Sequence, residues 1–311
     1  MKKYHVGIDI GGTKIKFGLF YKQELIKLWE IETNTENNGE NIINDTANSL
    51  IETLKLDDIK YYQISGIGIG IPGIVKNNEV IFAPNIFWKN KNIIKEMEDL
   101  TKIKNIKCIN DANAATLGEQ WKGNAKKYKN FVLITLGTGI GGGVIIDNKL
   151  YEGALGSAGE FGHLYSDDAK KYMCNCGKCG CVELVASANG LPRIAESILD
   201  DLNDCSIDRQ KYESTKNIWT LVENGDNIAT RVAEIFGKNI GIMLANISAI
   251  LNPDAIIIGG GMSKSGPIVI EYIKKYFNEY SYKGCKNTII EAASLDNKAG
   301  IYGLAKLAMN K

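Results

Sequence analysis

The chain has 311 residues, enough for one large domain or two ordinary ones, with 44% hydrophobic and 23% charged residues. A formal net charge of +1 offers no basic field for a nucleic acid or an anionic membrane surface. No apolar run reaches the ~20 residues of a membrane span, and the N-terminal stretch lacks the apolar core of a signal peptide. We therefore expect a cytoplasmic protein with reduced cysteines that binds neither nucleic acid nor membrane.

Strands and helices alternate in the first third of the chain. Runs of β-branched and aromatic residues bounded by turn residues predict strands at Tyr4–Ile10, Ile15–Phe20, Ile64–Ile71 and Lys107–Ile109. Apolar residues at helical spacing predict a helix over Glu40–Leu54, and another helix is expected from Ala112 to Trp121. A glycine turn joins the first two strands, which should therefore form a β-hairpin.

A second cycle of strands and helices begins near residue 131. Strands are predicted at Phe131–Leu136, Val144–Asp147 and Ala255–Ile258, and helices at Asp226–Leu251 and Asn297–Met309. Between the first two of these strands lies a predicted glycine turn, Gly137–Gly143, and the polar segment Asp200–Thr220 is expected to be an irregular surface insertion. The repeated strand, glycine turn and strand predict two similar α/β lobes. The smaller lobe would comprise residues 1–115 and 297–311, and the larger one residues 116–296.

The first glycine turn, DIGGTK, combines an acid, two glycines, a hydroxyl and a lysine. Glycines let backbone N–H groups approach a phosphate closely, and successive N–H groups form a nest for an anion. The candidate phosphate-binding residues are Gly11, Gly12, Thr13 and Lys14. Asp9 is a candidate for holding Mg²⁺ through water. An ordinary hairpin turn would have the same appearance.

Two further glycine turns follow strands. LGTGIGGG contains G-x-G-x-x-G, but a strand rather than a helix follows it, so the context excludes a dinucleotide-binding turn. No G-x-x-x-x-G-K-[ST] pattern occurs either. We interpret Gly137, Thr138 and Gly139 as a second phosphate-binding hairpin. In IIIGGGMS, Gly260 and Gly261 end a buried strand and can pass close to a flat ligand such as adenine, although a simple βα turn fits equally well.

Four of the seven cysteines lie together in CNCGKCGCVE. Disulfides are disfavoured by the expected compartment, and a redox C-x-x-C at Cys176 and Cys179 lacks a thioredoxin-like context. The C-x-C-x₄-C spacing of Cys174, Cys176 and Cys181 instead favours a structural zinc ion, which needs a fourth ligand. The chain has two histidines, and His5 belongs to the first strand.

These motifs resemble the ROK family of sugar kinases and repressors, particularly its glucokinase-type branch. DIGGTK, GIGIGIPG, NDANAATLGE, LITLGTGIGGG, GSAGEFGH and CNCGKCGCVE occur in the order found in that family. The resemblance implies the actin-like ATPase (ribonuclease H-like) α/β fold, in which two lobes hold ATP and sugar in the cleft between them. It also implies ATP and Mg²⁺ at the three glycine turns and a structural Zn²⁺ on the larger lobe.

The resemblance also assigns roles to individual residues. It makes Asp111 the catalytic base; from its position alone, Asp111 would be read as the cap of the following helix. It makes His163 the fourth zinc ligand, beside Cys174, Cys176 and Cys181. The implied sugar contacts are Asn85, Asn110, Glu160, His163 and Glu183. Cys179 departs from the family motif and is expected to be a spare thiol or an alternative ligand.

The implied activity is transfer of the γ-phosphate of ATP to the 6-hydroxyl of a hexose, with glucose as the leading candidate. N-acetylmannosamine, mannose, fructose and allose remain open. Repressors of the family carry a helix-turn-helix ahead of the first glycine turn, for which the residues before Asp9 leave no room. A non-catalytic sugar sensor is disfavoured by the presence of Asp111 and the phosphate turns. Family members are commonly dimers or tetramers, so we expect a homodimer or homotetramer.

Overall fold

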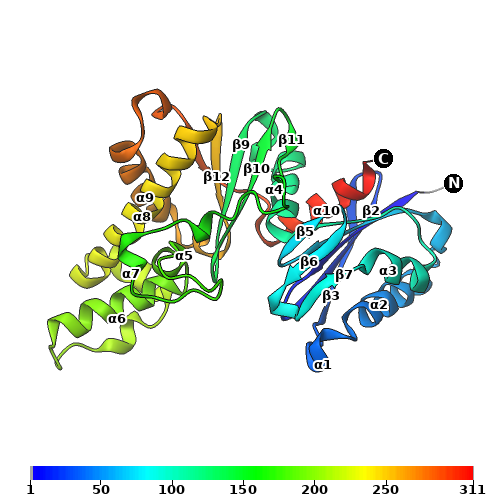
Figure 1. Ribbon diagram of the computed structural model, residues 1–311, viewed down its shortest axis with the longest axis horizontal. Coiled ribbons are helices and arrows are strands. Elements are labelled where there is room, and N and C mark those ends of the chain that lie inside the picture. Colours follow the sequence, from blue (N-terminus) through cyan, green and yellow to red (C-terminus); the bar gives the residue numbers. More distant parts are fainter. Residues whose placement is uncertain (1–2, 311) are drawn as a thin grey trace. The chain divides into compact units, whose positions relative to one another are not determined.

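The computed structural model describes residues 3–310 and divides into two compact units (Figure 1). Unit 1 comprises Met1–Lys127, Lys149–Ala158 and Asn297–Lys311, and unit 2 comprises Tyr128–Asn148 and Gly159–Asp296. Compared with the lobes drawn from the sequence, residues 116–127 and 149–158 fall in unit 1 rather than in the larger unit.

Unit 1 is built on a five-stranded mixed sheet in the order β3-β2-β1-β4-β8. These strands are β3 (Glu24–Glu32), β2 (Lys14–Tyr21), β1 (Tyr4–Ile10), β4 (Ile64–Ile71) and β8 (Ile106–Asn110). The first hairpin is confirmed, because β1 and β2 pair antiparallel across the DIGGTK turn. Strand β4 pairs parallel with both β1 and β8.

The ISGIGIGI pattern of β4 presents a different surface to each layer of helices. Its isoleucines share an apolar core with α2 (Ile42–Leu56) and α3 (Ile93–Thr101). Its glycines face α10 (Ala299–Met309), where a Cβ on Gly68 would lie 2.1 Å from the carbonyl oxygen of Leu304. Only glycine permits such a close approach between a strand and a helix. Helix α4 (Asp111–Trp121) packs on α10, and the short α1 (Glu36–Gly39) precedes α2.

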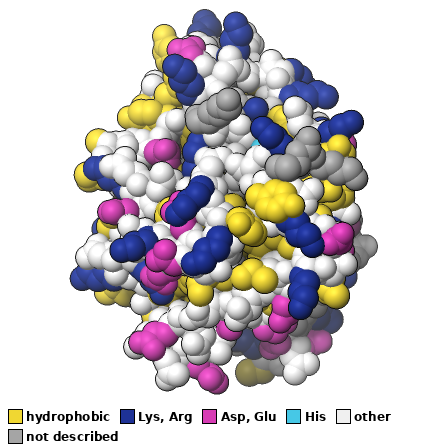
Figure 2. All heavy atoms as spheres, turned by 90° about the vertical axis from the view of Figure 1, so that its right-hand side faces the viewer, with side chains coloured by type: hydrophobic (Ala, Val, Ile, Leu, Met, Phe, Trp, Pro, Cys, Tyr) yellow, Lys and Arg dark blue, Asp and Glu magenta, His cyan; other side chains and the backbone are white. Residues whose placement is uncertain are grey.

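Unit 1 also contains a small antiparallel sheet that the sequence patterns did not indicate. It consists of β5 (Ile74–Lys76), β6 (Glu79–Ala83) and β7 (Trp88–Lys91). The turn between β5 and β6 uses Asn77 and Asn78 with φ of 51° and 66°, a conformation that asparagine tolerates. Asn85 lies on a 3₁₀ turn, Pro84–Ile86, between β6 and β7. On the face drawn in Figure 2, the described lysine and acidic side chains are interspersed, in line with the small net charge.

Unit 2 contains a second mixed sheet, in which β10 (Ile140–Ile146) pairs antiparallel with β9 (Phe131–Leu136). Strand β12 (Ala255–Gly259) pairs parallel with β9 and with β13 (Ile289–Ala292). The short β11 (Lys149–Leu150) follows β10 along the chain. The predicted turn Gly137–Gly143 was too long, because Gly141, Gly142 and Gly143 pair with β9. The ladder hydrogen bonds offset the conformational freedom that these glycines lose.

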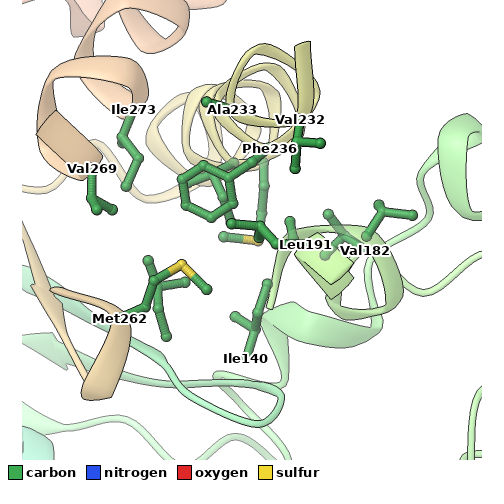
Figure 3. Close-up of a cluster of buried hydrophobic side chains, with 14 of the residues drawn as sticks. Ile140, Val182, Leu191, Val232, Ala233, Phe236, Met262, Val269 and Ile273 are labelled. Carbon is green, nitrogen blue, oxygen red and sulfur yellow. The ribbon is translucent and has the colours of Figure 1, made fainter. Parts of the chain in front are cut away.

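Five helices accompany this sheet. They are α5 (Glu183–Ala186), α6 (Gly190–Leu202), α7 (Thr215–Glu223), α8 (Asn227–Leu251) and α9 (Pro267–Tyr280). Among the described residues, α8 alone has the length and mean hydropathy (1.2) of a membrane-crossing helix, and 56% of its most apolar window is buried. Val232, Ala233 and Phe236 of α8 are fully buried in the core of unit 2, as in the core helix of a globular domain (Figure 3).

The predicted irregular insertion, Asp200–Thr220, was wrong in part. Helix α6 continues to Leu202, and α7 already begins at Thr215 with Ser214 as its N-cap. Ile218 and Trp219 are buried in the core, so the end of this segment is an amphipathic helix rather than a surface loop. Most residues of the segment are polar, so the short apolar stripe of α7 does not stand out in the sequence.

Candidate functional site

In unit 1, three strand ends bring the predicted site residues to one edge of the sheet. Strands β1, β4 and β8 are parallel, with Asp9 opposite Gly70 and Ile71 opposite Asn110. The carboxyl ends of parallel strands meet at one edge, where α/β proteins commonly bind ligands. The DIGGTK turn and the Asn110-Asp111 pair therefore share this edge.

Asp9 lies near the end of β1, with its carboxylate against α10. A Cβ placed on Gly300 would lie 3.5 Å from its Oδ2. Burial raises the pKa of the Asp9 carboxyl above its ordinary value, and the positive charge of Lys16, its cross-strand partner, acts in the opposite direction. A partly buried carboxylate whose pKa is raised by desolvation gains from a nearby cation, so Asp9 fits the predicted Mg²⁺ role.

The glycine turn after Asp9 is held by its own backbone and by the chain beyond β3. Gly11 N–H donates to the Lys14 carbonyl at 3.0 Å. Thr33 donates twice, from its N–H to the Thr13 carbonyl at 2.8 Å and from its hydroxyl to the Gly11 carbonyl at 2.8 Å. No local pattern indicates this role for Thr33, because it lies beyond strands β2 and β3 from the turn.

Two further contacts involve the predicted residues of this turn. A Cβ on Gly12 would lie 3.6 Å from the carbonyl oxygen of Asn85, so the candidate phosphate turn and a candidate sugar contact are neighbours. The Lys14 ammonium is bonded to the Glu30 carboxylate on β3, and this hydrogen bond raises the pKa of Lys14.

The residue that caps α4 is Asn110 and not Asp111. The Asn110 side chain accepts from Asn113 N–H at 3.0 Å, and its amide donates to the Gly73 carbonyl at 3.0 Å. Asp111 is the first helical residue, and its Oδ1 accepts from Ala112 N–H at 2.9 Å. The positive end of the helix dipole favours the ionised form of a carboxyl there. The cap role expected for Asp111 was therefore wrong, because its neighbour occupies the capping position.

In unit 2, two glycine turns lie at the corresponding edge of the sheet. Strands β9 and β12 are parallel, with Gly259 opposite Thr135, so the turns that follow them are adjacent. A Cβ on Gly260, which has φ of 87°, would lie 2.4 Å from the Leu136 carbonyl oxygen. Within the described part of the chain, no heavy atom other than those of the glycine and its two chain neighbours lies within 4 Å of a Cβ placed on Gly137 or Gly261, which leaves room for a ligand.

The predicted zinc ligands lie together in unit 2. The ligand atoms of His163, Cys174, Cys176 and Cys181 are all within 4.8 Å of one another. Nδ1 of His163 is 3.8 Å from Cys174 Sγ, and the sulfurs of Cys176 and Cys181 are 3.5 Å apart. Three thiols and one imidazole form a donor set that suits tetrahedral zinc. Cys179 lies outside this group, with its thiol 4.0 Å from Met173 Sδ.

Two carboxylates lie on either side of His163. Oε2 of Glu160 is 3.8 Å from Nε2, and Oε1 of Glu183 is 3.7 Å from Nδ1. Burial raises the pKa of Glu160, and the charge of Glu183 raises it further while His163 lowers it. Nδ1 is the nitrogen that faces the cysteines, and Nε2 is the nitrogen that faces Glu160.

A family model described as the ROK family matches residues 5–311. The chain belongs to the ROK family. A glucokinase of Halalkalibacterium halodurans is 35% identical over 309 residues, covering 97% of this chain and 93% of that protein. The xylose repressor of Bacillus subtilis is 29% identical over 312 residues, covering 99% of this chain and 77% of the repressor.

Solved structures support the same assignment for this ROK-family chain. The crystal structure of a ROK family glucokinase from Streptomyces griseus, in complex with glucose and AMPPNP, has a TM-score of 0.80 and 31% identity. The match covers 98% of this chain and 99% of that one. The predicted actin-like ATPase fold is thereby confirmed.

Sequence reasoning missed the residues that hold the loop of residues 163–182, called the cysteine loop below, which carries the candidate zinc ligands of this ROK protein. Arg193 donates to the Leu184 carbonyl at 2.5 Å and lies over the Tyr172 ring at 5.3 Å. Asn239 of α8 is buried and donates to Asp168 at 2.8 Å, and its carbonyl accepts from the Ser166 hydroxyl. Arg193 is one of three arginines in a lysine-rich chain. Since arginine is preferred over lysine where one side chain makes several contacts, this rarity is the feature of the sequence that could have pointed to Arg193.

The segments that carry the unit 2 site are anchored in one core. Ile140 follows Gly139, Val182 precedes Glu183, and Met262 follows Gly261. Figure 3 shows these three side chains in one buried cluster with Leu191 and Phe236. Because packed cores resist displacement, this shared anchoring fixes the turns and the cysteine loop with respect to each other.

Proposed function

We propose that this ROK-family protein is an ATP-dependent sugar kinase that transfers the γ-phosphate to the 6-hydroxyl of a hexose, with glucose as the preferred acceptor. The observation that carries the proposal is the meeting of a glycine turn and a helix-N-terminal aspartate at one sheet edge in unit 1. Phosphoryl transfer to an alcohol needs a gripped nucleotide and a carboxylate near the hydroxyl. The glucokinase relatives support the acceptor.

In the proposed reaction, the Asp111 carboxylate accepts the proton of the sugar 6-hydroxyl. The hydroxyl oxygen forms a bond to the γ-phosphorus as the bond from that phosphorus to the β,γ-bridging oxygen breaks, and ADP leaves. The Asn110 side chain accepts a hydrogen bond from Asn113 N–H and donates one to the Gly73 carbonyl, and these bonds hold it beside Asp111. Mg²⁺, held through water near Asp9, would neutralise the charge of the phosphates.

The proposed sugar contacts come from polar side chains that match vicinal hydroxyls. They are Asn85 and Asn110 in unit 1, and Glu160, His163 and Glu183 in unit 2. A site with buried hydrogen-bonding groups rejects an epimer that leaves one of them unpaired. The proposed phosphate contacts are the N–H groups of the turns at Gly11–Lys14, Gly137–Gly139 and Gly260–Gly261.

The cysteine loop is proposed to hold a structural zinc ion through His163, Cys174, Cys176 and Cys181. Such an ion would fix the loop that carries Glu160 and Glu183, which supports a metal requirement for sugar binding. Chelation followed by titration with glucose tests this requirement, and we expect the sugar affinity to fall. Unchanged affinity in the fully demetallated protein would contradict it.

A coupled ADP-release assay over glucose, mannose, fructose, allose and N-acetylmannosamine tests the function itself. We expect turnover, with the highest kcat/KM for glucose. A higher value for another acceptor would reassign the substrate and leave the kinase intact. Sugar binding without turnover on any acceptor would indicate a sensor.

The cysteine cluster, with its thiols reduced, suits the proposed cytoplasmic location. The chain is also proposed to form a homodimer or homotetramer, and light scattering tests this oligomeric state.

A further inference from the structure

The two carboxylate oxygens of Glu183 meet two different parts of unit 2. Oε1 lies 3.2 Å from the sulfur of Cys174 and 3.7 Å from Nδ1 of His163. Oε2 accepts from Ile140 N–H at 3.3 Å, next to the candidate phosphate turn Gly137–Gly139. One side chain therefore spans the candidate metal ligands and a backbone amide that adjoins the turn.

The contact between this carboxylate and the turn depends on a glycine. A Cβ on Gly139 would lie 2.6 Å from Oε2 of Glu183, closer than real side chains allow. A Cβ on Gly162, on the other side, would lie 3.2 Å from the same oxygen. The backbone thus leaves this space for the Glu183 carboxylate.

The segment that begins with Glu183 contacts the turn at both ends. Ile140 N–H donates to the Glu183 carboxylate, and Ala188 N–H donates to the Gly137 carbonyl at 2.8 Å. The same segment is tied to the cysteine loop by Leu184 N–H, which donates to the Cys181 carbonyl at 3.0 Å. Movement of the cysteine loop would therefore reach the turn through residues 183–188.

We propose that Glu183 is a positioning residue for the Gly137–Gly139 turn, so that nucleotide affinity depends on the cysteine loop even when no sugar is bound. This role goes beyond the sugar contact proposed above and rests on the proposed function only in naming the turn's ligand as a nucleotide. A hydrogen bond to a carboxylate that orients a backbone turn reduces the ordering cost of ligand binding.

Calorimetric titration with AMPPNP and Mg²⁺, without sugar, tests the proposal on the zinc-loaded full chain. Glu183→Ala should weaken AMPPNP binding about tenfold, which corresponds to the loss of roughly 1.4 kcal/mol. Glu183→Gln keeps an acceptor oxygen and should lose less. Glu196→Gln, at an exposed position of α6, is the control and should leave AMPPNP affinity within about twofold of the wild type. Affinity of Glu183→Ala within about twofold of the wild type would overturn the proposal.

Hydrogen exchange of the peptide spanning residues 136–143 provides a second readout that needs no nucleotide. Deuterium uptake should rise in Glu183→Ala and in the chelated wild type, but not in Glu196→Gln. Equal uptake in all four samples would overturn the positioning role. If the wild type binds no AMPPNP at all, the proposed kinase function fails, and the uptake comparison still decides whether Glu183 orders the turn. Glu183→Gln serves both measurements if the alanine variant does not fold.

Discussion

The two glycine turns, Asp9–Lys14 in unit 1 and Leu136–Gly139 in unit 2, share residue types but are held in different ways. In unit 1, the carboxylate comes from Asp9, which lies in β1 and is itself the first residue of the turn. Thr33, just after β3, donates hydrogen bonds to the turn and so holds it in place. In unit 2, the carboxylate is Glu183, which comes from a distant helix that also adjoins the cysteine loop.

The difference suggests a division of roles between the two edges. The unit 1 edge carries Asp9 near the end of β1 and Asp111 at the start of α4, both on regular elements that would suit the proposed reaction centre. The unit 2 edge depends on a loop with little regular structure, held by candidate metal ligands and by buried polar contacts. Changes in unit 1 should therefore act mainly on turnover, and changes in unit 2 mainly on ligand and metal binding.

Asp111→Asn should have the largest effect on activity, and it tests the expectation that changes in unit 1 act mainly on turnover. The amide cannot accept the hydroxyl proton, so we expect kcat to fall by about 10²–10⁴-fold, while the side chain keeps its place at the start of α4. The coupled ADP-release assay measures the loss. Sugar affinity should change little.

Asp45→Asn, in the first turn of α2, is the matched control because it makes the same chemical change at another helix start. Its kcat should stay near the wild-type value. Substantial turnover in Asp111→Asn would remove Asp111 from the reaction and place the chemistry elsewhere.

Cys174→Ser and Cys179→Ser test the expectation that changes in unit 2 act mainly on ligand and metal binding. The two cysteines lie in the same loop. Cys174 is buried among the candidate ligands, whereas Cys179 is exposed and lies beside Met173. Cys174→Ser should lose the proposed zinc ion and much of the sugar affinity, because the ion would keep only three ligands. Cys179→Ser should retain one zinc per chain by elemental analysis. Loss of zinc from Cys179→Ser would make Cys179 a ligand after all.

Patterns that depend on neighbouring residues were predictable from the sequence. The first hairpin, the buried strand β4 and the helix after Asn110 follow from local composition, and the structure has each of them. The meeting of His163 with the three cysteines rested on the family motif, and their ligand atoms do lie together.

Features that depend on contacts between distant segments were not predictable. The glycines at Gly141–Gly143 look like a turn, and only their pairing with β9 makes them a strand. Asn110 rather than Asp111 caps α4, because the geometry of the strand end decides which residue precedes the helix. The hydrogen bond between Glu183 and Ile140 joins residues far apart in the sequence, with no local pattern to reveal it.

Asn239→Leu tests whether buried polar contacts hold the unit 2 edge. The change leaves the Asp168 carboxylate and the Ser166 hydroxyl without the Asn239 amide, and should cost about 1–3 kcal/mol of unfolding free energy. Denaturant titration measures the cost, and zinc should also dissociate faster. Lys238→Leu, at the adjacent exposed position of α8, should be close to neutral. Equal stability of the two variants would mean that the core alone holds the loop.

Asp9→Asn is expected to have the smallest effect on stability, and its pH dependence separates the two edges. Burial raises the folded-state pKa of Asp9 above its unfolded value, so its contribution to stability is full below the unfolded pKa and is lost as pH rises through the folded pKa. At pH 7 without Mg²⁺, Asp9→Asn should therefore melt higher than the wild type, by about 2–4 °C for each kcal/mol of relieved cost.

That advantage should shrink as the pH falls from 7 toward 4, since the wild-type carboxyl becomes protonated. Thermal melts over this range, with Asp45→Asn as the reference, measure the trend. A lower melting temperature for Asp9→Asn at pH 7 would mean that hydrogen bonds to the carboxylate outweigh its burial. The Asp9 carboxylate would then stabilise the sheet edge in unit 1, much as Glu183 is proposed to position the Gly137–Gly139 turn in unit 2.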